Sequence, residues 1–442
     1  MNNITKTILS VAIILGGLFI FQNAFADTHA SASCSYADVN TAISAASNGD
    51  VVTIPSGACT WTSGITVSKN ITIQGAGYLN TKITMNGTAF TLSEASTRIT
   101  GIGFILTSGD VQINITGGSG WRIDHCQFTN TSGISKESID VNGINVSSTP
   151  AGLIDNNDFV EGRIVVSRAS NTTEARTLWA AEHLYGSADT TGLGTVYIED
   201  NTFYKTVSGG GNVIDASAYT GAYVARYNTI TGTTQFQVHS FQDANNRGAR
   251  AWEIYGNSFA ASSLTWGAMF IRSGAGFIFN NSIASYSYGV VFDNVRSFEN
   301  ITTAGQCDGN SLWDGNTEGQ KGWPCRDQIG RGKDTSLWTV GNPYPDQESK
   351  PAYLWSNIKS GSNIAVYIHN GSGDWIKANR DYYEQVTTFN GTSGVGCGTL
   401  ANRPTSCTPG VAYWATNQSC TDMTGMVGVN PATPIEGTLY KC

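Results

Sequence analysis

One pattern of hydrophobic and polar positions returns along the middle of the chain. An apolar residue is followed by two or three polar ones, an Asn, one more residue and then an aromatic or aliphatic residue. The pattern occupies residues 154–159, 198–203, 225–230, 254–259 and 278–283, and residues 123–128 carry it with Cys126 in the Asn position. Successive Asn positions, from Asn157 to Asn281, are 44, 27, 29 and 24 residues apart.

These steps are too short for a strand, a helix and a returning strand, but they suit one turn of a solenoid made from two or three short parallel strands. Asn side chains stacked at a bend can hydrogen-bond one another along the solenoid axis. We therefore predict an all-β fold, a right-handed parallel β-helix.

The pattern also predicts how the chain is divided. Apolar residues at Val39, Ala42, Ile43 and Ala46 have helical spacing, which indicates a short helix that covers the first coil and protects its open edge. We predict that the β-helix spans residues 27–370, with loop insertions near 171–193 and 302–350 where the rhythm is interrupted. The tail, residues 371–442, contains cysteines and aromatic residues and is predicted to be a C-terminal cap.

Between the Asn-bearing segments lies a second series of strands. We aligned these strands by the last apolar residue before a polar one, because neighbours in a strand point to opposite faces and the polar residue then points outward. The alignment predicts one outward row, which consists of Asp140, Ser167, Asp215, His239, Arg272 and Asp293.

This row contains groups that can move protons. We predict that His239, Arg272, Asp215 and Asp293 are catalytic, since a carboxylate, an imidazole and a guanidinium would lie in contact on consecutive coils. Asp215 and Asp293 would be three coils or about 14 Å apart, too far for a pair of glycosidase carboxyls. Elimination from an acidic sugar instead needs a base and a positive charge, which His239 and Arg272 can supply. A surface ladder of ion pairs is the alternative interpretation.

Three arginines and one tryptophan are predicted to help bind substrate. Arg247, Arg250 and Arg296 add positive charge near the row, although each can also brace a loop. Trp179, on the first insertion, can stack on sugar rings as part of a groove wall or pack against the coil.

Composition and charge exclude several classes of protein. Charged residues make up 13% and hydrophobic residues 40%, with 51 Gly and 10 Pro, which fits neither a disordered chain nor a coiled coil. The formal net charge is -8 and no basic run is present, so nucleic acid is not an expected partner.

The first residues and the cysteines indicate export. Residues 1–26 have a basic start, an apolar stretch and a small-residue cleavage signature, so we predict a signal peptide, no membrane span, and a secreted or periplasmic protein. Nine cysteines fit an oxidising compartment. By proximity the expected disulfide pairs are Cys34 with Cys59, Cys307 with Cys325, Cys397 with Cys407 and Cys420 with Cys442. Cys126 is expected to be a buried free thiol.

Two short segments carry a resemblance to a known family. Trp121-Arg122-Ile123-Asp124-His125 resembles the W-x-I-D-H strand of the pectate lyase superfamily. Glu137-Ser138-Ile139-Asp140 is similar to the calcium-binding E-S-x-x-D segment that follows there, shortened by one residue. Arg272, eight residues before Asn280, is similar in placement to an arginine that helps to hold the acidic substrate. The likeness covers roughly residues 120–285.

The resemblance implies a right-handed β-helix, calcium-assisted elimination from uronate polysaccharides, and Glu137 and Asp140 as calcium ligands. The catalytic arginine of the family lies five residues before the position of Arg272, where this chain has Gly267. The resulting hypothesis is a divergent polysaccharide lyase that acts on an acidic polysaccharide with His239 as base. A non-catalytic carbohydrate-binding or surface protein, and a glycoside hydrolase or epimerase on the same fold, are the alternatives. The oligomeric state is left open.

Overall fold

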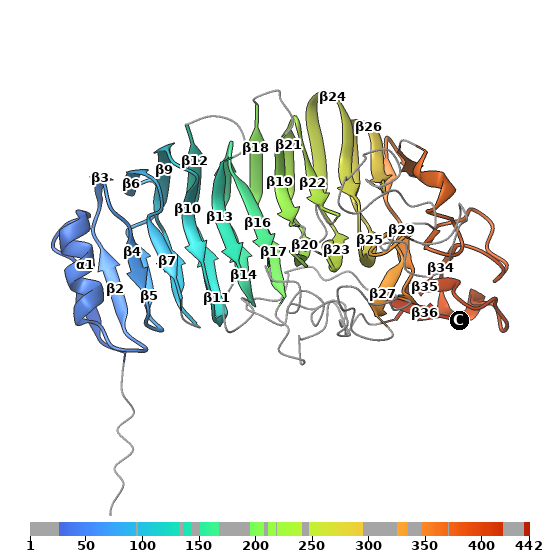
Figure 1. Cartoon of the computed structure of the whole chain (residues 1–442), viewed down its shortest axis with the longest axis horizontal. Coiled ribbons are helices and arrows are strands. Elements are labelled where there is room, and N and C mark those ends of the chain that lie inside the picture. The colour runs from blue at the N-terminus through green and yellow to red at the C-terminus, as the bar shows by residue number, and fades with distance from the viewer. Residues whose placement is uncertain are drawn as a thin grey trace, which may run out of the picture.

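The computed structural model describes residues 26–93, 96–131, 136–143, 151–167, 195–206, 211–217, 219–240, 247–294, 325–334, 347–369, 371–418 and 437–442. Short strands stack coil upon coil along the long axis (Figure 1). The helix α1 (Tyr36–Ala45) lies at one end of the stack, and the strands nearest the C-terminus lie at the other.

One parallel sheet, called sheet A here, has 12 strands among the described residues. In spatial order these are β1 (Thr28–Ala30), β2 (Val51–Ile54), β5 (Thr72–Gly75), β8 (Arg98–Thr100), β11 (Ser119–Asp124), β14 (Ala151–Asp155), β17 (Val196–Glu199), β20 (Ala222–Arg226), β23 (Ala251–Tyr255), β25 (Ala275–Phe279), β29 (Ala352–Trp355) and β33 (Tyr382–Glu384).

The remaining coil strands form two further parallel ladders. The second ladder contains β3 (Gly57–Trp61), β6 (Thr81–Asn86), β9 (Gly103–Ser108), β12 (Gln127–Asn130), β15 (Asp158–Val160), β18 (Thr202–Lys205), β21 (Thr229–Gly232), the first parts of β24 (Ser258–Ile271) and β26 (Ser282–Phe292), and β30 (Ile358–Lys359). The third ladder contains β4 (Ile65–Val67), β7 (Phe90–Leu92), β10 (Val111–Ile115), β13 (Glu137–Asn142), β16 (Arg163–Ser167), β19 (Gly211–Ala216), β22 (Thr234–Val238), the second parts of β24 and β26, and β32 (Val366–Ile368).

With three strands in a coil, the spatial neighbour of a strand is the third strand after it in the chain, as β2, β5 and β8 show, and a parallel β-helix requires this order. The fold class predicted from the sequence, including the N-terminal helix, is confirmed. Among the described residues no helix is long and apolar enough to cross a membrane.

The repeated Asn builds the bend between sheet A and the second ladder. Asn157, Asn201, Asn228, Asn257 and Asn281 are buried, and each side-chain amide donates to the carbonyl oxygen of the next Asn at 3.0–3.1 Å. Asn281 continues the row to Asn357 at 2.8 Å. The residue before each Asn has a positive φ, from 52° at Asn280 to 67° at Gly256. A left-handed residue turns the chain, and the Asn then satisfies the backbone groups that the turn exposes.

The residue two places after each Asn points into the coil. Phe104, Phe128, Phe159 and Phe203 stack on consecutive coils with ring centroids 4.7–5.2 Å apart. Ile, Val and Phe side chains from all three ladders complete one continuous core. The interior therefore repeats with the coil, which explains why the hydrophobic pattern is visible in the sequence.

Shorter elements complete the described structure. β27 (Arg331–Asp334) pairs with β28 (Gln347–Ser349), and β31 (Ser362–Asn363) pairs with β30. Near the C-terminus lie the 3-10 helices η2 (Ser372–Asp374) and η3 (Leu400–Asn402) and a sheet of β34 (Val395–Gly398), β35 (Ala412–Ala415) and β36 (Thr438–Lys441). Trp414 of this small sheet packs on Trp355, with centroids 4.9 Å apart, so the small sheet covers part of the outer face of sheet A.

The disulfides agree only in part with the predicted pairs. Cys34 bonds Cys59, as predicted, and Cys126 is buried and free. Cys407 bonds Cys442, and Cys397 is free, so the pairs predicted for Cys397 and for Cys442 are wrong. Pairing by proximity failed because β36 returns antiparallel to β35 and carries residue 442 back beside residue 411. Cys325 is disulfide-bonded, whereas Cys307 and Cys420 lie outside the described residues, as do residues 1–25 of the predicted signal peptide.

The first testable prediction concerns the stacked Asn residues. Asn228 donates to Ile198 and Asn257 and accepts from both the backbone and the side chain of Asn201. Asn228→Ala removes four buried hydrogen bonds and leaves partners unsatisfied, so we expect a loss of about 3 kcal/mol in the free energy of unfolding. Chemical denaturation measures the loss. Thr202→Ala, an exposed position on β18, is the control, and equal stability of the two variants would contradict the prediction.

Candidate functional site

The outer face of the third ladder presents two rows of side chains. Each of its strands has two inward apolar residues, such as Ile139 and Val141 in β13 or Phe236 and Val238 in β22. Row 1 consists of the residues between these two, and its members from β10 onward are Asn114, Asp140, Val165, Asp215, Gln237, Phe270, Val291 and Tyr367. Row 2 consists of the residues that follow the second inward position, and its members from β13 onward are Asn142, Ser167, Ser217, His239, Arg272, Asp293 and His369.

The single row predicted from the sequence is therefore wrong in register at three steps. Asp215 is aligned with Gln237 rather than with His239, and Asp140 is aligned with Val165 rather than with Ser167. The last apolar residue before a polar one is the first inward position in β13 and β19 but the second in β16 and β22. A shift of two residues keeps every side chain on its face, so the hydrophobic pattern does not reveal it.

Asp215 and His239 nevertheless meet, because the two rows are adjacent. Nδ1 of His239 lies 2.7 Å from Oδ1 of Asp215, a diagonal ion-pair contact between neighbouring coils whose geometry is not that of a hydrogen bond. The Asp215 side chain is only 7% exposed, whereas that of His239 is 22% exposed. An imidazole whose Nδ1 faces a carboxylate leaves Nε2 for another partner, an arrangement that suits acid–base catalysis.

Arg272 and Asp293 continue row 2 beyond His239. Their backbone amides donate to Val238 and Ile271 of the preceding coils, which keeps the row in register. The guanidinium of Arg272 lies over the ring of Phe270, 4.8 Å from its centroid. His239 and Arg272 are thus on adjacent coils, about 4.8 Å apart at the backbone.

Asp293 has a supporting position. It is fully buried, accepts a hydrogen bond from the hydroxyl of Ser372 at 2.7 Å, and lies 3.3 Å from Nδ1 of His369. A second Asp–His pair therefore follows Arg272, and its carboxylate also holds η2 to the coil. This placement suits positioning of His369 better than contact with a substrate.

The arginines predicted to bind substrate lie elsewhere. Arg247 and Arg250 are fully buried, and Arg247 makes a two-pronged ion pair with the buried Asp327 at 2.6 and 2.7 Å. Because both arginines are buried, they are not placed to contact a substrate directly. The ion pair instead joins the segment of Arg247 to that of Asp327. Arg296 and Trp179 lie outside the described residues.

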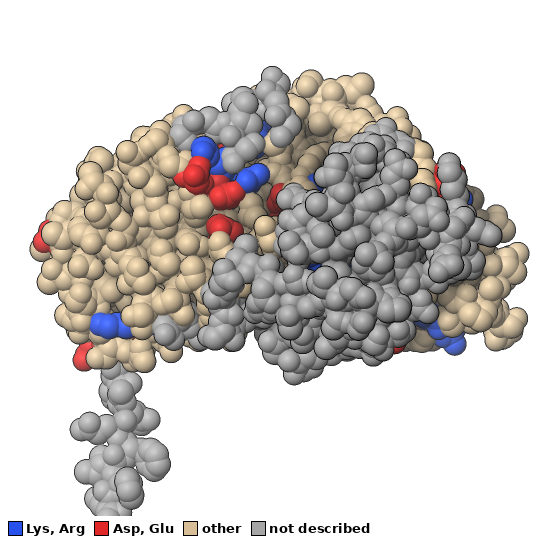
Figure 2. Space-filling model, viewed as in Figure 1, with Lys and Arg blue, Asp and Glu red and all other residues tan. Residues whose placement is uncertain are grey.

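Glu137 and Asp140 lie on the outer face of β13, close to Arg163 of the neighbouring strand β16. Figure 2 shows charged atoms of both signs gathered around β13 and β16, where Arg163 pairs with Glu137. Burial, and then the charge of Glu137, raises the pKa of Asp140 to about 6. Asn142 donates to Asp140 at 3.2 Å.

This donor set fits calcium poorly. Calcium takes six to eight oxygens, and one of the two carboxylates is already neutralised by Arg163. Within the described residues no group of three His, Cys, Asp or Glu side chains is placed to hold a metal ion. The calcium site stays a prediction from the resemblance.

The W-x-I-D-H segment lies on sheet A, away from rows 1 and 2. Trp121 and Ile123 are buried in the core, and Asp124 forms a two-pronged ion pair with Arg98 at 2.6 and 2.7 Å. His125 is the left-handed residue of its bend, and its Nδ1 lies 2.7 Å from Asp124. The segment thus serves coil packing and an ion-pair ladder on the outer face of sheet A.

Sequence analysis missed the aromatic residues at the far end of the third ladder. Phe270 and Tyr367 belong to row 1, and Trp266 lies 5.0 Å from Phe270 between ring centroids. The signal was present in β24 as an aromatic residue directly between the inward Met269 and Ile271. This signal does not separate an exposed aromatic residue from a core one, because aromatic residues such as Phe236 also point into the coil.

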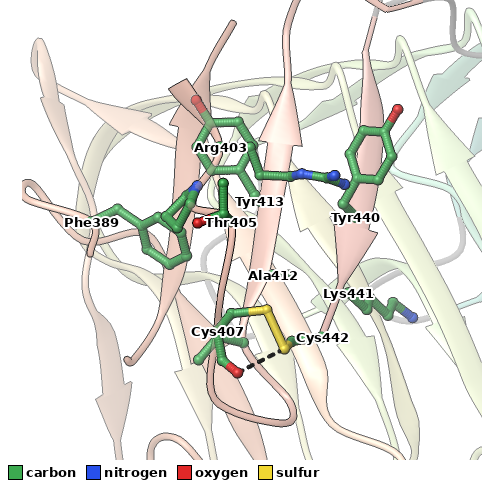
Figure 3. Close-up of a pocket in the computed structure, with 11 residues that line it drawn as sticks. Phe389, Arg403, Thr405, Cys407, Ala412, Tyr413, Tyr440, Lys441 and Cys442 are labelled. Atoms are coloured by element: carbon green, nitrogen blue, oxygen red, sulfur yellow. Dashed lines mark hydrogen bonds between the residues drawn. A yellow bond between two sulfur atoms is a disulfide. The ribbon is translucent and has the colours of Figure 1, made fainter. Parts of the chain in front are cut away.

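A separate pocket of about 230 Å³ lies in the C-terminal region (Figure 3). Phe389, Tyr413 and Tyr440 line it, and Arg403 lies 4.3 Å from the centroid of the Tyr440 ring. The disulfide between Cys407 and Cys442 forms part of its wall. No Asp, Glu or His lines this pocket, and none of its lining residues belongs to the third ladder. Rows 1 and 2 are therefore the candidate site.

Comparisons with known proteins give the following results. No protein-family model and no curated protein matches the chain. Among solved structures, an alginate lyase from Paenibacillus sp. str. FPU-7 has a TM-score of 0.45 at 10% identity, covering 78% of this chain and 99% of its own. A pectin methylesterase bound to a hexasaccharide has a TM-score of 0.32 at 11% identity, covering 78% and 93%. The catalytic domain of an α-1,3-glucanase has a TM-score of 0.32 at 13% identity, covering 82% and 68%. Similarity this low does not assign an activity.

The second testable prediction concerns the proton on Asp140. Its pKa of about 6 in the folded chain exceeds the ordinary value of 3.8. As the pH rises from about 4 to about 6, the unfolded chain releases this proton first, and the folded state loses stability. We expect the melting temperature of Asp140→Asn to rise relative to that of the wild type as the pH increases through this window. The difference should then stay constant at higher pH. Melting curves at closely spaced pH values measure the gain, and a difference that is constant from pH 4 to pH 7 would contradict the prediction.

Proposed function

We propose that the chain is an exported protein that cleaves an acidic polysaccharide by β-elimination on the outer face of the third ladder. The observation that carries the proposal is the contact of Asp215 with His239, with Arg272 on the next coil. The disulfides support export, because such bonds form in oxidising compartments.

His239 is the base of the proposed reaction. Its Nε2 takes the proton at C5 of a uronate ring while Asp215 stabilises the imidazolium that forms. Arg272 pairs with the sugar carboxylate and stabilises the negative charge that develops on it when the proton leaves. The electron pair then forms a double bond between C4 and C5, the C4–O bond breaks, and the leaving oxygen takes a proton from water, while the imidazolium of His239 returns its proton to the hydroxide left behind. The product is an unsaturated uronyl end.

A glycoside hydrolase is the second candidate, favoured by the raised pKa of Asp140. Asp140 and Asp215 share row 1 and are two coils apart, about 10 Å at the backbone, near the upper end of the spacing in inverting glycosidases. A carboxyl with a pKa of about 6 suits a general acid, and Asp215 would be the base. The raised pKa of Asp140 has no role in the elimination.

The third testable prediction separates these reactions. The mature protein is incubated with pectate, alginate and hyaluronan, and ultraviolet absorbance of unsaturated uronyl ends and the number of reducing ends are followed. We expect unsaturated ends from the wild type on at least one polymer and a loss of about 100-fold or more in His239→Ala, because general base catalysis contributes at least that much.

His125→Asn is the matched control, since it changes another partly exposed His that pairs with an Asp, and Asn accepts the left-handed backbone there. Full activity in His239→Ala would refute the proposed role of that residue. New reducing ends without unsaturation, lost in Asp140→Asn, would favour hydrolysis. Binding without any change in polymer length would favour a non-catalytic protein.

A further inference from the structure

An aromatic cluster lies beside the proposed catalytic residues on the outer face of the third ladder. The cluster, called the aromatic platform here, consists of Trp266, Phe270, Tyr288, Tyr367 and His369 from β24, β26 and the end of β32. The indole of Trp266 meets Phe270, His369 and Tyr288 edge to face at 5.0, 5.1 and 6.5 Å between centroids. Tyr288 and Tyr367 stack at 3.8 Å.

The exposure of Trp266 is unusual for this protein. Trp266 keeps 37% of its surface exposed, whereas the other tryptophans of the described chain, Trp61, Trp121, Trp252, Trp355, Trp375 and Trp414, are all at most 7% exposed. A large aromatic side chain held by its neighbours on an open surface, and not in the core, is typical of a binding site. The perpendicular contacts fix the indole, so little side-chain freedom is lost when a ligand binds.

Charge and position indicate what the platform binds. Arg272 lies over the ring of Phe270 and so places a guanidinium beside the platform. No carboxylate among the described residues belongs to the platform. Of those beside it, Asp293 is buried and paired with His369, and Glu384 accepts a hydrogen bond from the backbone amide of Val366. A ligand with an apolar ring face and a negative charge, such as a uronate ring, matches both features.

The distance to the catalytic base sets the length of the ligand. His239, Arg272, Asp293 and His369 lie on four consecutive coils, so His369 is three steps or about 14 Å from His239 at the backbone. That span exceeds one sugar ring. Phe270, the near edge of the platform, lies on the coil next to His239, so a ligand that reaches from His239 to the far edge at His369 must be an oligosaccharide that lies along the solenoid axis.

We propose that the aromatic platform is a binding subsite for a ring of an acidic polysaccharide, separate from the ring whose bond is broken at His239. The inference rests on the proposed function for the position of the reaction. It adds that the platform supplies affinity for polymer and that short substrates, which do not reach from His239 to His369, bind more weakly.

The fourth testable prediction measures binding without turnover. Trp266→Leu keeps an apolar side chain but removes the aromatic face, and Trp266→Phe restores a smaller one. Titration calorimetry with pectate, alginate and hyaluronan is performed with all variants in a His239→Ala background, which lacks the proposed base. We expect the Leu variant to bind its preferred polymer about tenfold more weakly and the Phe variant to recover part of the loss.

Tyr204→Leu is the matched control, because Tyr204 is an exposed aromatic residue, 49% exposed, on β18 in the second ladder. Circular dichroism and melting temperature confirm that each variant is folded. Unchanged affinity in Trp266→Leu, or an equal loss in Tyr204→Leu, would overturn the subsite, and so would a His239→Ala parent that binds none of the polymers. If Trp266→Leu weakens binding but the wild type forms no unsaturated ends, the subsite is upheld and the proposed elimination is refuted.

Discussion

The bend between sheet A and the second ladder is the constraint on which the remaining structure depends. A left-handed residue turns the chain, and the Asn that follows satisfies the backbone of its own coil and of the neighbouring coils. Because the same bend recurs from Asn157 to Asn357, each coil begins in register with the previous one. Side chains that are two or three dozen residues apart in sequence are thereby brought into contact on the outer face.

The sequence was sufficient to predict this architecture because the bend has a fixed chemical requirement. Only a side chain that both donates and accepts hydrogen bonds can continue the row, and only an apolar residue fits inside the coil. Both residue types therefore recur in the sequence once in each coil. The short helix was predictable for the same reason, since Val39, Ala42 and Ile43 are buried on one side of it. The disulfide from Cys407 to Cys442 was not, because the small C-terminal sheet has no repeat to indicate how its strands return.

The site was predictable only in part because side chains outside the coil leave no such period. His239, Arg272 and Asp293 were correctly placed on consecutive coils, where each strand ends with its second inward residue. Asp215 and Asp140 were assigned to the wrong row because a shift of two residues preserves the inward and outward pattern. The aromatic platform was missed because an exposed Trp266 or Phe270 has the same sequence signature as a buried one.

Cys126 occupies the position in the bend where later coils have Asn. Its amide donates to Asn157, but its thiol has no amide group with which to continue the row toward the N-terminus, and burial raises the pKa of that thiol to about 12. The earlier coils are therefore joined at this bend by fewer polar contacts, whereas the bond between Cys34 and Cys59 ties the first of them together. Amide hydrogens should accordingly exchange in two cooperative blocks, with the boundary at the coil that lacks the carboxamide.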